Sequence, residues 1–212
     1  MATLPKRTRQ ASEFRQGSLV DAALQLAALR TPADITTGDL AQAVGITQGA
    51  VFRHFPSKEA IWLAVLDWSA HTLLAQLQTA AAQAPTPMAA LQAVFAAHVD
   101  FVTEHPGVPR LIFQELQHAQ DTPLKASVRD LMQQYRMLVM GLLRNAQEAQ
   151  FLQAGTDIAA AAVLFLGAVQ GLVMQAMVSG QAQTMAAQAP GVFTLYLRGI
   201  ARSAPPSPES TP

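Results

Sequence analysis

Apolar residues recur every three or four positions along most of the chain, and this period constrains the fold more than any other feature. Between Leu91 and Val102, for example, the apolar residues repeat at helical spacing. This spacing places them on one face of an α-helix. No stretch alternates apolar and polar residues in the way of a half-buried strand. The sequence therefore predicts an all-α protein of about nine helices without a sheet.

Prolines and glycines separate the predicted helices. Breaks are expected at Ala84–Pro87, at His105–Pro109 and at Gly155, and Ala189–Gly191 interrupts or opens the last helix. The first helix is expected to begin near Ser12, since serine is a good N-cap. The chain is thus expected to pass through a succession of helices joined by short turns.

Composition excludes several classes of protein. Half of the residues are hydrophobic and 13% are charged, a balance typical of a packed globular chain and opposite to that of a disordered one. The chain has no cysteine, which excludes disulfides, thiolate metal sites and a cysteine nucleophile. Because the basic start of the chain is not followed by an apolar core, no signal peptide is expected.

The net charge of zero, from 14 basic and 14 acidic residues, argues at first against a nucleic-acid binder. The charge is unevenly distributed, however. Residues 1–58 hold seven basic and four acidic residues, a net charge of +3, and residues 59–212 hold seven basic and ten acidic residues, a net charge of −3. The neutral total therefore conceals a basic N-terminal part. The arm at residues 6–9 could follow phosphates or reach a minor groove, and a solvated N-terminus is an equally good interpretation.

Residues 35–59 have the pattern of a helix–turn–helix. A short helix over 37–43 is followed by Gly45, which supplies the left-handed conformation that ends a helix. Thr47 then caps a second helix over 47–54. A three-residue turn containing glycine between two short helices is typical of this motif.

The second of these helices has an exposed face that suits a major groove. Its exposed residues are expected to be Gln48, Gly49, Phe52 and Arg53, with Ala50 near the edge. They are short or flat, and none is acidic. Such a face could enter the major groove, because it carries no acidic side chain for the DNA phosphates to repel.

The segment resembles the DNA-binding domain of the TetR family of bacterial transcriptional regulators. The matching parts are the threonine pair Thr36-Thr37, the turn Val44-Gly45-Ile46, the run Phe52-Arg53-His54-Phe55 and the triplet Ser57-Lys58-Glu59. The resemblance covers Ser12–Lys58, and the rest of the chain matches in architecture only. It implies an N-terminal three-helix DNA-binding domain followed by a helical ligand-binding and dimerisation domain.

The resemblance also implies which residues meet DNA. Thr37 and Thr47 are similar to helix-terminal threonines that meet phosphate, and His54 and Lys58 to further phosphate contacts. Contacts with base edges are expected from Gln48, Ala50 and Arg53. A glutamine can form two hydrogen bonds with adenine. The full predicted DNA-binding set is Thr37, Thr47, Gln48, Gly49, Ala50, Phe52, Arg53, His54 and Lys58.

Two positions depart from the family pattern. Phe52 stands where the family usually has a tyrosine whose hydroxyl meets phosphate, and Gly38 has no side chain where some relatives read bases. Direct base contacts are therefore expected to be few. Phosphate contacts and DNA shape would carry a larger share of recognition.

The region from Ile158 to Leu197 contains no charged residue and no histidine. Its first part, Ile158–Gly180, is long enough to cross a membrane, but its alanines and glutamines favour a helix–helix interface instead. Family members dimerise through two such helices from each chain. The residues expected at the dimer interface are Leu164, Gly167, Gly171, Leu172 and Leu195. An interior helix of a monomer is the alternative interpretation.

A small-molecule pocket is the second expectation that comes from the resemblance. The candidate lining residues are Trp68, Phe95, His98, Phe113, Tyr135, Gln170 and Met174. His98 lies on the apolar side of its predicted helix, so a histidine buried in the core with one partner is an equally good interpretation.

The chain is expected to comprise a DNA-binding part over 1–57, a ligand-binding and dimerisation domain over 58–203 and a disordered proline-rich tail over 204–212. It is predicted to be a cytoplasmic homodimeric regulator, a repressor that binds a pseudo-palindromic DNA operator and responds to a small apolar or amphipathic effector. No cofactor, metal or membrane partner is expected.

Two other functions remain open. One is a DNA-binding protein without a small-molecule ligand that acts through a protein partner, such as division or nucleoid machinery. The other is a metal-dependent helical bundle, because Glu115 and His118 have the spacing found in di-iron proteins. No second such pair exists in the chain and no phosphate-binding loop or nucleophile motif is present, so the protein is not expected to be an enzyme.

Overall fold

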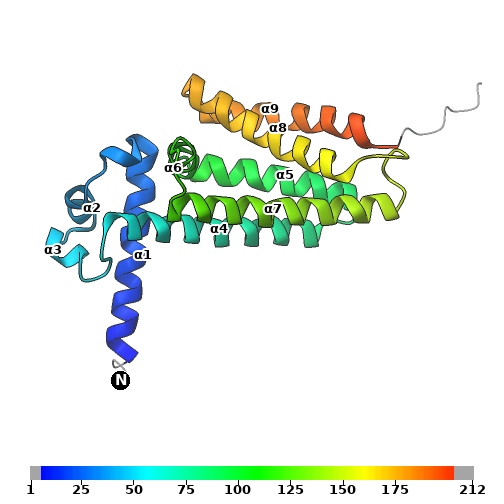
Figure 1. Cartoon of the computed structure of the whole chain (residues 1–212). Helices are drawn as coiled ribbons and strands as arrows, with labels where there is room; N and C mark the ends of the chain where they lie inside the picture. The colour runs from blue at the N-terminus through cyan, green and yellow to red at the C-terminus, as the bar shows by residue number, and fades with distance from the viewer. Residues whose placement is uncertain (1–5, 203–212) are drawn as a thin grey trace, which may run out of the picture. The chain divides into compact units, whose positions relative to one another are not determined.

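The computed structural model describes residues 6–202, with side chains described for residues 14–181 and 183–202. This part of the chain is helical, with one 3₁₀ helix and no strand. The elements are shown in Figure 1 and are α1 (Lys6–Leu29), η1 (Pro32–Asp34), α2 (Thr37–Val44), α3 (Gln48–Val51), α4 (Lys58–Gln83), α5 (Pro87–Glu104), α6 (Gly107–Leu116), α7 (Pro123–Glu148), α8 (Ile158–Ser179) and α9 (Ala182–Ile200). The all-α prediction is confirmed over these residues.

Helix α1 begins before its predicted start at Ser12. The backbone from Lys6 onward is already helical, because residues 6–16 include neither proline nor glycine. The predicted arm at residues 6–9 therefore belongs to the helix, although its side chains lie outside the described residues. The predicted tail over 204–212 also lies outside them.

Helix α3 is shorter than predicted and α9 is longer. The regular part of α3 ends at Val51, and tight turns follow in which His54 N–H donates to the Val51 carbonyl at 2.9 Å. Pro56 disfavours helical backbone at the residue before it.

Helix α9 continues through Pro190, whose missing N–H leaves the carbonyl of Ala186 without its helical donor. Both of these residues are exposed, so water can satisfy that carbonyl.

The chain divides into two compact units, one of residues 1–73 with 101–132 and the other of residues 74–100 with 133–212. The division differs from the predicted boundary after residue 57, which stays a prediction. Helices α4, α5 and α7 each continue from one unit into the other.

The first unit is organised around the contact of α1 with α6. Leu19 and Ala23 of α1 are fully buried, and Gly107 at the start of α6 lies against the backbone of α1. A Cβ atom at Gly107 would approach the carbonyl oxygen of Leu24 to 2.5 Å. The absence of a side chain there is what permits the close packing.

A hydrogen bond joins η1 to the same helix pair. The backbone N–H of Ala33 donates to Oε1 of Gln114 at 2.9 Å. The turn that leads into α2 is thereby tied to α6.

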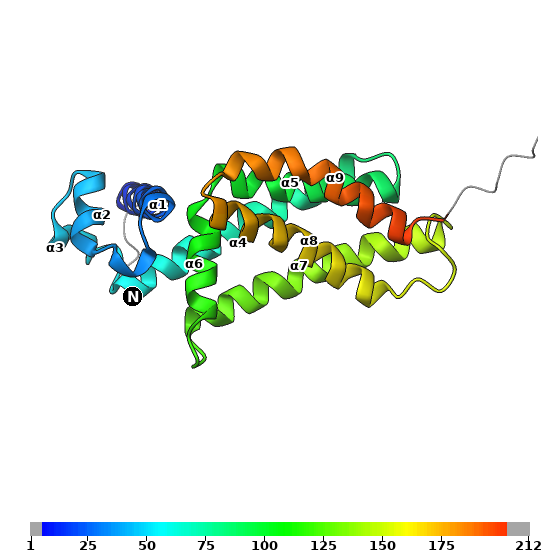
Figure 2. The same ribbon diagram turned by 90° about the horizontal axis from the view of Figure 1, so that it is seen from above.

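The second unit is organised around α8 and α9, which run side by side in both views (Figures 1 and 2). Phe165 of α8 is fully buried and meets the rings of Phe95, Phe193 and Tyr196 edge-on at 5.4 to 6.4 Å between centroids. The hydroxyl of Tyr196 donates to the Ala161 carbonyl at 3.2 Å. An aromatic core thus fixes α9 against α8.

A polar pair lies inside this aromatic core. Nδ1 of His98 and the hydroxyl oxygen of Tyr135 are 3.0 Å apart, and both side chains are buried. Burial lowers the pKa of His98 from 6.5 to about 4, because the charged imidazolium loses its hydration. Of the two interpretations that the sequence left open for His98, the structure supports a buried histidine with one partner.

Substituting Gly107 with alanine is expected to lower the free energy of unfolding by about 1–3 kcal/mol, because the new methyl group must displace the backbone of α1. Urea unfolding checks the value. The control is Gly141→Ala within α7, where an added Cβ meets nothing within 4 Å, and this change is expected to stabilise by up to about 1 kcal/mol. Equal effects at the two glycines would contradict the close contact.

His98 is expected to make stability depend on pH. Its pKa is depressed in the folded protein, so its contribution is fully present above pH 6.5 and is lost as the pH falls towards 4. Between about pH 8 and about pH 5 the loss should be about 2 kcal/mol. Urea unfolding of His98→Gln should show this part of the pH dependence removed, while His71→Gln, at an exposed histidine, should leave it in place. The same pH dependence in both variants would refute the assignment.

Candidate nucleic-acid interface

The turn between α2 and α3 has the geometry that the sequence predicts. Gly45 ends α2 in the left-handed conformation with φ of 70°. The next N–H, of Ile46, donates back to the carbonyl of Ala41 at 2.9 Å. Thr47 then caps α3, its hydroxyl oxygen accepting the N–H of Ala50 at 3.2 Å. The predicted helix–turn–helix is confirmed.

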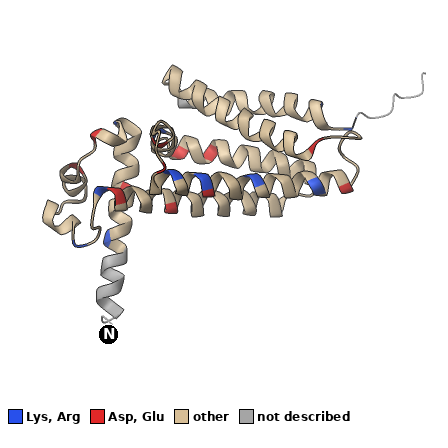
Figure 3. Cartoon of the chain, viewed as in Figure 1, with Lys and Arg blue, Asp and Glu red and all other residues tan. Residues whose placement is uncertain are grey.

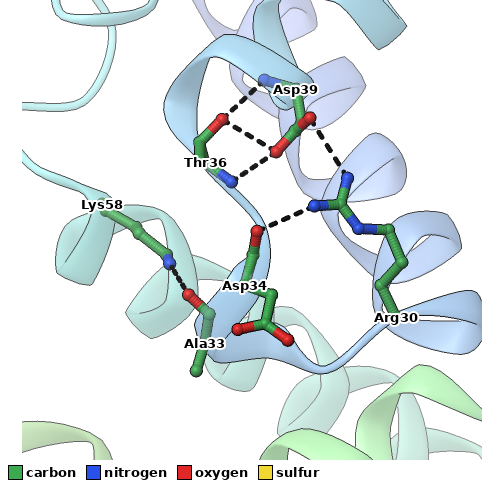
Figure 4. A network of polar contacts seen from close by, with 6 residues as sticks. All are labelled: Arg30, Ala33, Asp34, Thr36, Asp39 and Lys58. Carbon is green, nitrogen blue, oxygen red and sulfur yellow. Dashed lines mark hydrogen bonds and ion pairs between the residues drawn. The ribbon is translucent and has the colours of Figure 1, made fainter.

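A reciprocal cap fixes the start of α2 (Figure 4). The hydroxyl of Thr36 accepts the backbone N–H of Asp39 at 3.1 Å, and Oδ2 of Asp39 accepts the backbone N–H of Thr36 at 2.7 Å. The hydroxyl proton of Thr36 is also donated to Oδ2, at 2.8 Å. The hydrogen bonds to the carboxylate from Thr36, together with Arg30, lower the pKa of Asp39 to about 2. The Asp39 carboxylate in this cap is therefore fully charged at neutral pH.

Arg30 extends this cap to the end of α1, and no pattern in the sequence indicates this role. Its guanidinium lies 3.1 Å from Oδ1 of Asp39 and donates to the carbonyl of Asp34 at 2.8 Å (Figure 4). The pair is half-exposed, so its energy is modest. Arg30 stands nine residues before Asp39 in the sequence, and no local periodicity pairs residues at that distance.

The exposed face of α3, in which we include the turn residues Phe52 and Arg53 that follow the helix, is the one predicted. Gln48, Gly49, Phe52 and Arg53 are exposed, and Ala50 is half-buried at the edge. The opposite side is anchored in the unit, where Val51 is fully buried and Phe55 is 8% exposed. Because the apolar side of α3 packs into the unit, the predicted residues lie on its exposed side. Their contact with DNA stays a prediction.

Gln48 and Thr37 are joined across the turn. Nε2 of Gln48 donates to the hydroxyl oxygen of Thr37 at 2.8 Å. The predicted base-reading residue and one of the predicted phosphate-binding residues are thus in direct contact. Thr37 is the first residue of α2 and not its cap, which is Thr36.

Lys58, at the start of α4, is directed towards η1. Its Nζ donates to the carbonyl of Ala33 in η1 at 2.7 Å (Figure 4). Partial burial lowers the pKa of Lys58, and the nearby charges of Asp34 and Asp39 oppose that shift. The ammonium group has two further protons, so it could meet a phosphate, as predicted, while it keeps this carbonyl.

His54, also predicted to meet phosphate, is half-buried at the end of the motif. Its backbone carbonyl accepts Nε2 of Gln16 from α1 at 3.0 Å. The last turn of the motif is thereby held against α1, within the same unit.

In the second unit, α8 and α9 expose apolar side chains, which we call the exposed apolar face. Its members are Val163, Leu164, Met174, Met177 and Val178 of α8 and Leu195 of α9. No residue of α8 is charged, as Figure 3 also shows. By length and composition alone α8 could also cross a membrane, but a core helix of a soluble protein has the same length and composition.

Four of the five residues predicted at the dimer interface lie outward on these helices. Leu164 is 56% exposed and Leu195 is 68% exposed, while Gly167 and Gly171 are exposed with open space above them. Leu172 differs from the prediction, because it is buried at 5% exposure on the core side of α8. It follows Phe165 at a spacing of seven residues, which places both on one side of a helix.

A pocket of about 130 Å³ lies between α5 and α9 in the second unit. Its walls include Phe95, Val99 and Phe193, and the polar residues at its edge are Gln92 and Asp100. It is mainly apolar with a few polar groups, as small-molecule sites usually are, but it is smaller than the roughly 300–1,000 Å³ that is usual for such sites.

The residues predicted to line a pocket are not all at this one. Phe95 lines it, and His98 with Tyr135 forms the buried pair of the same unit. Gln170 and Met174 are exposed on α8. The two remaining residues, Trp68 and Phe113, belong to the first unit, so the predicted set stays a prediction.

Glu115 and His118, considered for a metal site, form a weak local pair. Oε1 of Glu115 and Nε2 of His118 are 3.8 Å apart, and Thr122 donates to the other carboxylate oxygen at 3.3 Å. In the part of the chain that the structure describes, no group of three or more possible ligands surrounds a common point. The two residues do not make up the ligand set of a di-iron site.

Comparisons with known sequences agree with this geometry. The model of the bacterial regulatory proteins of the tetR family matches residues 19–65, and that of the tetracyclin repressor-like C-terminal domain matches residues 87–190. The nucleoid occlusion factor SlmA of Actinobacillus pleuropneumoniae serotype 5b (strain L20) is 31% identical over 94 residues, which are 44% of this chain and 46% of that protein. The chain thus spans about half the length of that relative.

Solved structures share the fold over most of their length. The fatty acid degradation regulator FadR from Bacillus halodurans has a TM-score of 0.78 at 18% identity, covering 87% of this chain and 95% of that one. The transcriptional regulator FadR from Bacillus subtilis, in complex with stearoyl-CoA, has a TM-score of 0.76 at 17% identity, covering 86% and 98%. The helix–turn–helix, the two family matches and the shared fold lead to one conclusion: the chain belongs to the TetR family of bacterial regulatory proteins.

Proposed function

We propose that the protein is a cytoplasmic, homodimeric transcriptional repressor that binds a pseudo-palindromic DNA operator and is released by a small apolar or amphipathic effector. The observation that carries the proposal is the exposed face of α3, held by the Gly45 turn and by the burial of Val51 and Phe55. This face has the size and the lack of acids that major-groove entry requires. Membership of the family supports the same function.

The contacts with DNA would divide into two kinds. Gln48 of α3 and Arg53 of the turn after it are exposed and would read base edges. Thr37, Thr47, His54 and Lys58 would meet phosphates and fix the position of the motif on the duplex. Phe52 is 48% exposed without a polar atom in its side chain, so it would pack against sugar. Recognition would thus depend strongly on salt.

A homodimer would place two copies of α3 on one operator. One motif alone gives weak binding, and two half-sites about 34–36 Å apart are usual for such dimers. The exposed apolar face supplies the surface, because such large apolar side chains on adjacent helices usually mark an interface. The open glycines Gly167 and Gly171 would let a second copy approach closely.

The effector would bind within the helical domain, and the α5–α9 pocket with Phe95 and Phe193 is the candidate site. The regulator FadR of Bacillus subtilis was solved with stearoyl-CoA, which supports an amphipathic ligand for this type of domain. An effector that binds one conformation of the dimer more tightly would shift the population away from the spacing that fits the operator.

A second candidate function is a ligand-independent DNA-binding protein that acts through a protein partner. The relative described as a nucleoid occlusion factor favours it. The two functions differ in what the purified protein responds to. If small amphipathic molecules neither bind nor change operator affinity, the partner-dependent function is favoured.

The DNA-binding proposal is tested by selecting a preferred duplex from a random pool and titrating it against a scrambled duplex at several salt concentrations. A preference of about 10³-fold or more for the selected duplex is expected, with affinity that falls as salt rises. Equal affinity for both duplexes would contradict the proposal.

Gln48→Ala is expected to cost about 1–3 kcal/mol at the selected duplex and to relax preference at one base pair, because it removes a base contact. Titration against single-base variants of the duplex measures this. The control Gln76→Ala removes the same exposed side chain from α4 and should change nothing. Equal losses on selected and scrambled DNA would assign Gln48 to the backbone instead.

Lys58→Ala is expected to weaken binding to all duplexes alike and to lower the salt slope by about one, because a single phosphate charge is no longer neutralised. The control is Arg144→Ala, an exposed cation of α7 outside the motif, which should leave the slope as it is. An unchanged slope in Lys58→Ala would show that Lys58 neutralises no phosphate in the complex.

The double variant Leu164→Glu with Leu195→Glu is expected to be monomeric, because dimerisation would bury unpaired carboxylates. Light scattering after size exclusion gives the mass. Gln134→Glu, at an exposed position of α7, is the matched control and should stay dimeric. A double variant that remains dimeric would place the interface elsewhere.

A further inference from the structure

Three threonines lie at the helix ends of the motif, and they differ in whether the hydroxyl group can still donate a hydrogen bond. A hydroxyl has one proton to donate and can accept two hydrogen bonds. The hydroxyl of Thr36 accepts the N–H of Asp39 and donates its proton to Oδ2 of the same residue. Its only proton is therefore committed inside the cap.

Thr47 and Thr37 keep their protons. The hydroxyl of Thr47 accepts the N–H of Ala50 at 3.2 Å, and that of Thr37 accepts Nε2 of Gln48 at 2.8 Å. Each acts as an acceptor in these contacts, so each can still donate to an acceptor outside the protein, such as a phosphate oxygen. Thr36 cannot do so without breaking its cap.

Gln48 likewise keeps the hydrogen-bond donor and acceptor that it needs to bind a base. Its Nε2 carries two protons, of which one is donated to Thr37. The second proton and Oε1 remain available, and these are the donor and acceptor that bond N7 and N6 of adenine. The contact with Thr37 thus orients the amide without consuming the groups that would meet the base.

We propose that Thr37 is a positioning residue for base recognition, which acts through Gln48 as well as on phosphate. In the complex its hydroxyl would donate to a phosphate oxygen while accepting from Gln48, whose other proton meets the base. The phosphate contact and the base contact would then be two ends of one hydrogen-bonded chain. This inference rests on the proposed DNA-binding function.

The arrangement has a physical advantage for specificity. A free glutamine side chain loses rotamer freedom when it binds a base, and a side chain already held by Thr37 loses less. Consecutive hydrogen bonds in which each group both donates and accepts also polarise one another. Removing the Thr37 hydroxyl should therefore weaken reading of the base that Gln48 contacts, in addition to losing one phosphate contact.

The test is a double-mutant cycle with Thr37→Val, Gln48→Ala and the double variant, each titrated with the selected duplex and its single-base variants. Valine keeps the shape of threonine but can neither accept nor donate. We expect Thr37→Val to lower discrimination roughly tenfold at the same base pair that Gln48→Ala affects. The double variant should show little further loss of discrimination. Thr37→Ser, which restores the hydroxyl, should keep discrimination within about twofold of the original.

Three results would overturn the inference. Thr37→Val could weaken all duplexes equally, which would make Thr37 a phosphate contact alone, or its effect on discrimination could simply add to that of Gln48→Ala. Thr37→Ser could also fail to restore discrimination. If the unchanged protein shows no sequence preference at all, both the proposed function and this inference fail.

A second measurement does not depend on DNA. In a ¹⁵N-resolved spectrum the side-chain amide protons of Gln48 should differ in shift from those of the exposed Gln42, and Thr37→Val should remove that difference. An unchanged Gln48 signal in Thr37→Val would show that the two side chains are not bonded in solution. The melting temperature of each variant confirms that it is folded.

Discussion

The left-handed conformation of Gly45 is the constraint on which the DNA-binding part of the molecule depends. At φ of 70° the chain turns sharply enough for α3 to begin within three residues of the end of α2. A side chain at this position would be strained whatever space surrounds it. The turn decides which side of α3 carries Val51 into the core and which side carries Gln48 outward.

Hydrogen-bonded caps at the helix ends add to the effect of this turn. The Thr36–Asp39 cap starts α2, and Arg30 joins that cap to the end of α1. Polar groups that would otherwise be unpaired at the helix ends are satisfied by neighbouring side chains. The hydrogen bonds that fix the motif are thus formed before DNA binds, which lowers the entropic cost of binding.

Features that depend on local chemistry could be predicted from the sequence. Gly45, the cap at Thr47 and the outward side of α3 all follow from residue types within a few positions of one another. The pairing of Arg30 with Asp39, the hydrogen bond from Lys58 to η1 and the burial of Leu172 could not be predicted. Each depends on which elements meet in space, and periodicity alone does not determine that. Helix α1 starts earlier than Ser12 indicates, because this good capping residue lies within a longer run of helix-forming residues.

The central claim, that two copies of this motif act together on DNA, is tested most directly by hydroxyl-radical footprinting of the protein on its selected duplex. Two protected half-sites related by a two-fold axis, with centres one helical turn or a small multiple of it apart, are expected. Both should disappear together when the Leu164→Glu and Leu195→Glu changes are combined. A single protected half-site, or equal protection along the whole duplex, would contradict the account.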